Sequence, residues 1–127
     1  MSGAPRNILL IEDAPQVAGI LVSKLTREGH QVVWTRKRAQ ALEALSAGAF
    51  DLILLSTTLL PERNAWELLS ELKSGGPAGA PVLMLLEAEE QPLSEKALSM
   101  GAAGVIQKPF KPTQVAKQVR ELFAARA

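Results

Sequence analysis

Five short apolar runs alternate with segments of helical periodicity along the chain, and this alternation limits the fold more than any other feature. The runs are rich in Ile, Leu and Val and cover residues 8–11, 32–34, 52–55, 82–86 and 105–106. Strands that are apolar at successive positions are typical of a parallel sheet with helices on both of its faces. We therefore expect one doubly wound α/β domain, a (βα)5 unit in which each of five parallel strands is followed by a helix.

The segments between the runs carry apolar residues at helical spacing. The first is expected to be helical over 14–28 and to bury a stripe of four residues, Val17, Ile20, Leu21 and Leu25. Gly29 follows as a helix stop. A weaker stripe over 41–49 and a strong one over 65–72 predict the next two helices, the latter with Asn64 as its N-cap. The last two helices are expected to begin near prolines, Pro92 and Pro112.

The composition is typical of a globular protein and excludes several kinds of site. The 127 residues suit a single domain, 1–127, with a core over about 7–123, and 47% of them are hydrophobic. Cysteine is absent and His30 is the only histidine, so thiolate and multi-histidine sites are excluded, and His30 is expected to be exposed in a turn. The net charge of +1 gives no support for nucleic-acid binding. The longest apolar run is too short to cross a membrane, so we expect a cytoplasmic protein.

Polar residues follow four of the runs, at the sheet edge where sites lie in folds of this class. Glu12 and Asp13 follow the first run, three hydroxyl residues follow the third, Glu87 follows the fourth, and Lys108 comes soon after the fifth. Adjacent carboxylates suit a hard divalent cation such as Mg²⁺, and a lysine opposite them suits an anion. An isolated acid pair would more simply cap the next helix, so the combination of positions is what indicates a site.

Four segments make the sequence similar to the receiver domain of two-component response regulators over about residues 7–123. They run from Ile8 to Asp13, from Asp51 to Pro61, from Asn64 to Leu69, and from Gly101 to Phe110. Each segment alone is a weak signal, but their order and spacing together are specific. The resemblance implies a flavodoxin-like, CheY-like fold.

The resemblance also implies a mechanism. In that family an Asp at the end of the third strand accepts a phosphoryl group from a kinase phosphohistidine, with Mg²⁺ held by the acidic pair and that Asp. A lysine after strand five pairs with the phosphoryl group. A Thr or Ser ending strand four and an aromatic residue on strand five then move, and this changes the face of helix four, strand five and helix five that contacts a protein partner.

The acceptor position of this chain holds a hydroxyl residue. Counting back four residues from Pro61 places the acceptor at Thr57, and counting forward from Asp51 with a one-residue insertion places it at Ser56. Asp51 cannot substitute, because it lies at the other end of the same strand, roughly 17–20 Å away at ~3.3 Å per residue. By either way of counting, the position where the reaction needs an aspartate holds a hydroxyl residue.

The two switch positions are replaced while other residues of the family's site remain. This combination indicates a site that keeps the arrangement of the family's residues but does not carry out the phosphoryl transfer. Leu86 replaces the strand-four hydroxyl and Val105 the strand-five aromatic ring, so neither can make the family's movement. Four residues of the family's site remain, namely Glu12, Asp13, Lys108 and Pro109. The bond before this proline is expected to be cis if the loop keeps the family's shape. With a net charge of −1 instead of −2, the site is expected to hold no Mg²⁺ or to bind it weakly, and the lysine to form a structural ion pair with one acid of the pair.

Glu87 follows the strand-four switch position, where the family usually has a small residue. Turned toward Lys108, its carboxylate would mimic a phosphoryl group and hold the domain in one signalling state. Pointing to water with Glu89 and Glu90, it would belong to an acidic loop. The solvated orientation is the expected one, because Glu is rarely buried.

We therefore expect a receiver-like protein-interaction module of two-component, phosphorelay signalling that is not an enzyme and is not phosphorylated on Asp. Its expected partners are a histidine kinase, an output protein or an adaptor, bound through helix four, strand five and helix five, and a homodimer is left open. The first alternative is a receiver still regulated by phosphorylation, on Ser56, Thr57 or Thr58 or through unusual chemistry. The second, a flavodoxin-like cofactor binder or enzyme, is opposed by the lack of a Gly-rich phosphate loop.

Overall fold

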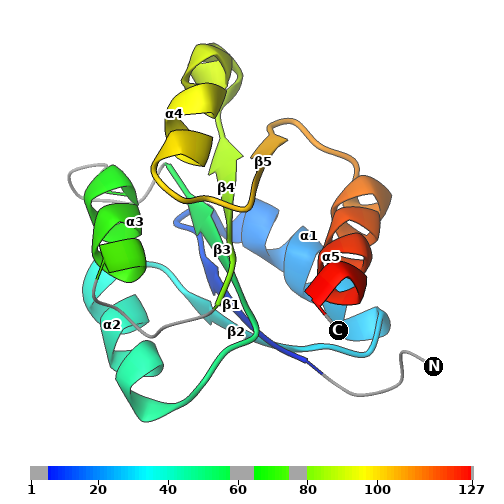
Figure 1. The fold of residues 1–127 in the computed structure, drawn as a ribbon. Helices are drawn as coiled ribbons and strands as arrows, with labels where there is room; N and C mark the ends of the chain where they lie inside the picture. Colours follow the sequence, from blue (N-terminus) through cyan, green and yellow to red (C-terminus); the bar gives the residue numbers. More distant parts are fainter. Residues whose placement is uncertain (1–5, 58–64, 75–79, 127) are drawn as a thin grey trace.

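The apolar runs form a parallel sheet between two layers of helices in the computed structural model (Figure 1). The structure describes residues 6–57, 65–74 and 80–126. Its strands are β1 (Asn7–Ile11), β2 (Gln31–Thr35), β3 (Leu52–Ser56), β4 (Val82–Leu86) and β5 (Gly104–Gln107). Its helices are α1 (Pro15–Arg27), α2 (Arg38–Ala47), α3 (Ala65–Ser74), the 3-10 helix η1 (Ala88–Leu93), α4 (Ser94–Ser99) and α5 (Pro112–Arg126).

The strands pair in the order β2-β1-β3-β4-β5, and all four pairings are parallel. This order reverses direction at β1, so the edge beyond the carboxyl ends of β1 and β3 is the place where a site is expected in such a sheet. The (βα)5 fold that the alternation predicts is confirmed. The expected N-cap Asn64 lies outside the described residues.

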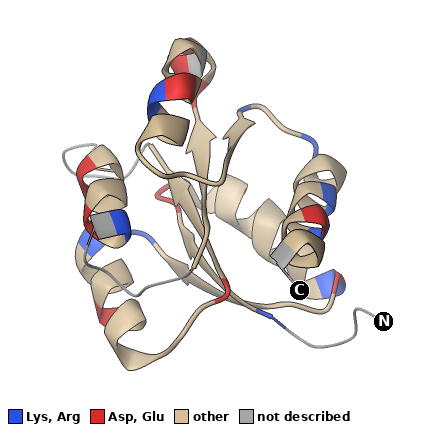
Figure 2. Ribbon diagram, viewed as in Figure 1, with Lys and Arg blue, Asp and Glu red and all other residues tan. Residues whose placement is uncertain are grey.

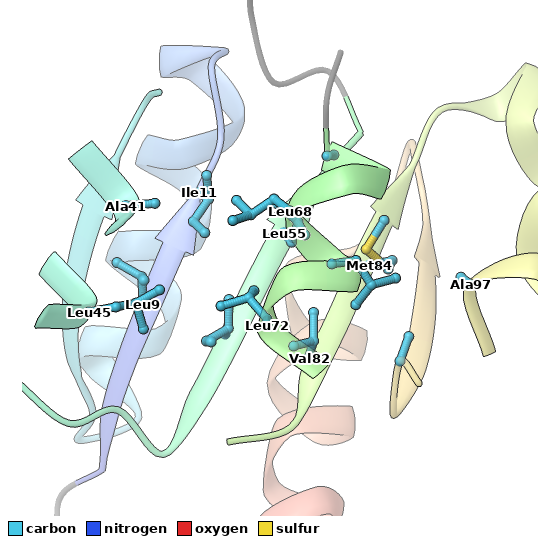
Figure 3. Packing of buried hydrophobic residues seen from close by; sticks show 14 of the residues in the cluster. Leu9, Ile11, Ala41, Leu45, Leu55, Leu68, Leu72, Val82, Met84 and Ala97 are labelled. Atoms are coloured by element: carbon cyan, nitrogen blue, oxygen red, sulfur yellow. The ribbon is translucent and has the colours of Figure 1, made fainter. Parts of the chain in front are cut away.

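Successive residues of each strand point to opposite faces of the sheet, so the apolar strands contribute to two cores. The core beneath α2, α3 and α4 takes buried side chains from three strands, namely Leu9, Ile11, Ile53, Leu55, Val82, Met84 and Leu86 (Figure 3). The core beneath α1 and α5 takes the alternate residues, namely Ile8, Leu10, Leu52, Leu54, Leu83, Leu85 and Ile106. This alternation also decides where the residues just beyond each strand point.

Two segments expected to be buried are partly exposed, and both lie at the margin of the sheet or its helices. The edge strand β2 is not buried on both faces, since Val33 and Trp34 are 44% and 38% exposed. Ile20 belongs to the apolar stripe by spacing but is 49% exposed, and the buried residues of α1 are Ala18, Leu21 and Leu25. Periodicity identified the helix but overestimated the width of its buried face.

The helix boundaries mostly follow the sequence signals. Pro15 occupies the first turn of α1, where its missing N–H costs nothing, and Gly29 ends the turn with φ of +96°, a conformation that favours glycine. The region around Pro92 differs from the expectation. Pro92 lies inside η1, and the short α4 begins only at Ser94.

Lys or Arg and Asp or Glu occur together on α3, α4 and α5 (Figure 2). Mixed charge of this kind is typical of solvated helix surfaces. Among the described residues, no helix is both long and apolar enough to span a membrane.

His30 is half-buried in the turn between α1 and β2, so the expectation of an exposed residue is wrong. Its ring meets that of Phe123 on α5 edge to face, with the centroids 5.4 Å apart. The Arg6 guanidinium lies 4.6 Å from the centroid of the same phenyl ring. Burial lowers the pKa of His30 and Arg6 lowers it further, whereas Glu28 opposes them.

We expect protonation of His30 to destabilise the fold. Because its pKa is lowered in the folded state, the unfolded chain binds the proton first, and stability is lost as the pH falls from above about 6.5 through the lowered folded-state pKa. Urea unfolding of the wild type and of His30→Phe at about pH 8 and about pH 5 should show a larger acid loss for the wild type. An NMR titration of this single imidazole at or above the ordinary value would contradict the prediction.

Candidate functional site

Four polar residues continue one face of four neighbouring strands beyond their carboxyl ends. Glu12, Ser56, Glu87 and Lys108 keep the alternation of the strand residues that face α1 and α5. They therefore point to the same side of the sheet and meet where β1, β3, β4 and β5 end. The two apolar cores bring these residues together, because each core fixes the register and the facing of its strands.

The Lys108 ammonium lies at the centre of this group. Its Nζ is 2.9 Å from Glu12 Oε1, 3.1 Å from Glu87 Oε2 and 3.1 Å from the Ser56 hydroxyl oxygen. The ammonium donates hydrogen bonds to Ser56 and Glu87, and its contact with Glu12 is an ion pair. Lys108 is 8% exposed, and Glu12 and Ser56 are fully buried. The lysine is therefore held in a buried cluster rather than displayed to solvent.

The ion pair between Glu87 and Lys108 contradicts the expected solvated orientation of Glu87. The carboxylate turns inward although its side chain keeps 31% of its surface exposed. Glu87 also accepts a hydrogen bond at its backbone oxygen from the Gln107 side chain, 2.8 Å away. Alternation explains the direction, since Glu87 continues Leu83 and Leu85 on the face toward α1 and α5.

The two candidate acceptor residues, at the end of β3 and just beyond it, face opposite sides. Ser56 lies at Lys108, whereas Thr57 continues Ile53 and Leu55 toward α3. The Thr57 hydroxyl contacts the Glu90 carboxylate and lies 3.3 Å from the Leu85 backbone oxygen. Of the two positions obtained by counting, Ser56 is thus the one that faces the lysine. Thr58 and Pro61 lie outside the described residues.

The acidic pair is divided between two environments. Glu12 pairs with Lys108 through one oxygen and accepts the Ala14 backbone N–H, 3.0 Å away, at the other. Asp13 instead turns toward Arg36, with 3.7 Å between the carboxylate and the guanidinium. The Trp34 indole N–H donates to the Glu12 backbone oxygen at 2.8 Å. Of the two partners expected for Lys108, the structure therefore selects Glu12.

The remaining predicted positions lie around this cluster. Leu86 is fully buried beneath α3 and α4, and Val105 packs against the same core while partly exposed. The Lys108–Pro109 bond is cis, as expected for a loop of the family's shape. Asp51 lies at the opposite end of β3, where its carboxylate accepts the Asn7 N–H at 2.8 Å.

Two residues of the site were not expected from the sequence, which placed Glu90 in a solvated acidic loop and gave Gln107 no role. Glu90 accepts hydrogen bonds from the Thr57 hydroxyl and from the Glu87 N–H, the latter at 3.0 Å. Gln107 binds the Glu87 backbone oxygen. The spacing of three between Glu87 and Glu90 was the available signal, because a Glu three residues after a helix N-cap often binds the N-cap N–H.

The site borders an open groove of about 550 Å³ between α1 and the loops that follow β4 and β5. Lys108 and Glu87 line one side of the groove, and the exposed Ile20 and the partly buried Phe110 line others. A molecule in solution would reach Lys108 through this groove.

Comparisons with known proteins agree with this geometry. A sequence model of the response regulator receiver domain matches residues 8–120. The transcriptional regulatory protein PcoR of Escherichia coli is 32% identical over 118 residues, which cover 93% of this chain and 51% of PcoR. The autoinducer 2 sensor kinase/phosphatase LuxQ of Vibrio vulnificus is 32% identical over 113 residues, which cover 89% of this chain and 13% of LuxQ. The chain therefore spans about half the length of PcoR and a small part of LuxQ.

Solved structures give the same answer for the fold. The receiver domain of NtrX from Brucella abortus has a TM-score of 0.83 at 27% identity, covering 90% of this chain and 95% of that one. The Francisella response regulator 1452 receiver domain has a TM-score of 0.86 at 19% identity, covering 96% and 99%. The chain belongs to the family of response regulator receiver domains, the signalling modules of two-component systems.

Proposed function

We propose that this receiver domain is a protein-interaction module of two-component signalling that works without phosphorylation of an aspartate and is not an enzyme. The observation that carries the proposal is the environment of Lys108. The β3 residue that faces this lysine is Ser56, a hydroxyl, and the lysine is engaged by Glu12 and Glu87. A serine hydroxyl has to lose a proton before it attacks phosphorus, whereas a carboxylate attacks directly.

Phosphorylation of a hydroxyl is the weaker alternative. Ser56 is fully buried and Thr57 is 2% exposed, so neither oxygen is open to an external kinase. Glu12 and Glu87, which share Lys108 with Ser56, are both ion-paired to that lysine, which opposes their use as a general base for the serine proton. A flavodoxin-like cofactor binder or enzyme finds no support in the groove, because its three carboxylates outnumber its one lysine, Lys108, and carboxylates repel phosphate groups.

The donor set also does not fit the Mg²⁺ ion that the family implies. Glu12 is buried against Lys108, Asp13 turns toward Arg36, and the β3 position holds a neutral hydroxyl. Mg²⁺ requires near-octahedral oxygen ligands and is usually held by one or two carboxylates that are free to coordinate it. Among the described residues, no cluster of three or more metal-ligating side chains occurs. We therefore assign no step of the function to a metal ion.

The proposed partners are proteins of the same signalling systems: a histidine kinase, an output protein or an adaptor. The similarity to a regulator and to a sensor kinase supports partners of this class. The proposed contact surface is the face of α4, β5 and α5, the face through which the family signals. A homodimer through this face is the second arrangement.

The proposed function predicts that a small phosphodonor does not modify the protein. Incubation with acetyl phosphate and Mg²⁺, followed by intact mass measurement, should leave the protein at its unmodified mass. A receiver with an Asp acceptor, treated in parallel, should gain one phosphoryl group. A hydroxylamine-sensitive adduct on this chain would overturn the proposal, and a hydroxylamine-resistant adduct would favour a hydroxyl acceptor.

The proposed function also predicts that Mg²⁺ does not engage the acidic pair. Because the Trp34 indole N–H binds the Glu12 backbone oxygen, its NMR resonance reports on any ion that engages Glu12. Millimolar Mg²⁺ should leave this resonance unchanged relative to that of Trp66 on α3, which serves as the internal control. A saturable shift confined to Trp34 would show that the acidic pair does bind the ion.

The ion pair between Lys108 and Glu12 is expected to stabilise the fold. Lys108→Met should lower the free energy of unfolding by about 3–5 kcal/mol, because it leaves the buried Glu12 carboxylate without its counter-ion. Lys111→Met, at an exposed position, should change it by no more than about 0.5 kcal/mol. Adding Glu12→Gln to Lys108→Met should recover part of the loss. Equal losses for the two lysine variants in urea unfolding would refute the structural role of Lys108.

A further inference from the structure

Glu90 links the segment after β4 to the end of the neighbouring strand β3 through its side chain, beyond the last paired residues of these two strands. Its carboxylate accepts the hydroxyl of Thr57, the residue just beyond β3, and the backbone N–H of Glu87, just beyond β4. Glu90 itself belongs to η1, the first segment on the path from β4 to α4. One side chain therefore ties the start of this path to the carboxyl edge of the sheet.

Glu87 is held at both ends of its backbone. Its N–H donates to Glu90 at 3.0 Å, and its backbone oxygen accepts the Gln107 side-chain N–H of β5 at 2.8 Å. The peptide groups on either side of its Cα are held in this way, which fixes the direction of its Cα–Cβ bond, and from there the carboxylate reaches Lys108 at 3.1 Å. The orientation of Glu87 is thus set by its neighbours as well as by its attraction to the lysine.

We propose that Glu90 is a positioning residue that directs the Glu87 carboxylate onto Lys108, so that an internal carboxylate holds the segment from η1 to α4 against the sheet. The proposal rests on the proposed function, in which no phosphoryl group reaches Lys108. In this arrangement the conformation near α4 is set by residues of the chain itself. Release of Glu90 would free Glu87 and the start of η1 together.

A helix cap alone does not account for the contacts of Glu90. Its bond to the Glu87 N–H, together with the Glu90 N–H donating to the Glu87 oxygen at 2.9 Å, is the arrangement of an N-terminal cap. A cap has no need of Thr57, a 2% exposed residue that follows a different strand. The hydroxyl of Thr57 anchors the cap to the sheet and thereby fixes where the helix begins relative to Lys108.

The far end of the same segment is also anchored. The Lys96 ammonium of α4 lies 4.6 Å from the centroid of a Trp66 ring on α3, a cation–π contact. The segment therefore has one attachment to β3 through Glu90 and one to α3 through Lys96. Loss of the first attachment should loosen the η1 end while the α4 end stays in place.

The test is an NMR comparison of single and double variants without any phosphodonor. Glu90→Ala should shift the Lys108 side-chain εCH₂ resonance in the same direction as Glu87→Ala does. It should also raise the hydrogen-exchange rate of the Glu87 amide about tenfold, because that N–H loses its acceptor. Glu90→Gln keeps an acceptor oxygen and should remain close to wild type. Glu89→Ala removes an exposed carboxylate from the same helix and is the matched control.

The double variant decides whether Glu90 acts through Glu87. In the Glu87→Ala background, Glu90→Ala should add no further shift at Lys108, because the effects of two substitutions do not add when one residue acts through the other. An unchanged Lys108 resonance in Glu90→Ala, or additive shifts in the double variant, would overturn the inference and leave Glu90 as a cap.

If Glu90→Ala does not fold, Thr57→Val tests the same inference. It removes only the hydroxyl that anchors Glu90, so a Lys108 shift toward that of Glu87→Ala supports the inference and a wild-type signal overturns it. Failure of the proposed function would appear instead in the mass spectrum after acetyl phosphate treatment, so the two failures are distinguishable.

Discussion

The ammonium of Lys108 is the interaction on which the rest of the site depends. It carries the single positive charge in a group that contains a fully buried Glu12, a buried Ser56 and the partly exposed Glu87. A carboxylate as deeply buried as that of Glu12 is costly unless a counter-ion and hydrogen bonds compensate it, and here Lys108 and the Ala14 N–H provide both. The same ammonium then draws in Glu87, and with it the start of η1. Loss of this one charge would leave two carboxylates facing each other across the end of β3.

The alternation of side chains along the strands explains why these residues meet and others do not. Residues of one parity extend the core beneath α1 and α5, and Glu12, Ser56, Glu87 and Lys108 share that parity. Residues of the other parity extend the core beneath α2, α3 and α4, and Thr57 and Leu86 belong to it. The packing of apolar residues several positions earlier in each strand therefore determines the chemistry at the sheet edge.

Much of the fold followed from local pattern, and parts of the site did not. The five strands and the stop at Gly29 were predictable because each rests on a run of apolar residues or on one glycine. The exposure of Ile20 was not, because helical spacing gives the direction of a face without its width. The choice between Ser56 and Thr57 was open when positions were counted from Pro61 or from Asp51. Counting parity from Leu52 and Leu54 would have selected Ser56, since that rule requires only the strand itself.

Glu87 was misjudged for a different reason. The general preference of Glu for solvent describes an average residue, whereas the position two beyond Leu85 lies on the face of the sheet that carries Lys108. His30 was misjudged similarly, because its partner Phe123 lies 93 residues later in the chain, on a helix whose packing no local pattern reveals. Both cases show a general tendency overridden by a contact between elements distant in sequence.

Charge balance gives a physical reason why the loss of the aspartate and the gain of Glu87 belong together. The site implied by the family has three carboxylates and one lysine, a net charge of −2. Replacing the acceptor by Ser56 leaves Glu12, Asp13 and Lys108, a net charge of −1. The inward turn of Glu87 gives Lys108 a second carboxylate in place of the missing aspartate, and the pairing of Asp13 with Arg36 keeps the net charge at −1. The added carboxylate comes from β4 rather than β3, however, and lies on the lysine itself. The electrostatic demand of Lys108 is thus met by a group that cannot be released as a leaving group or hydrolysed, and this is the physical basis for a receiver fold whose state does not depend on a transferred phosphoryl group.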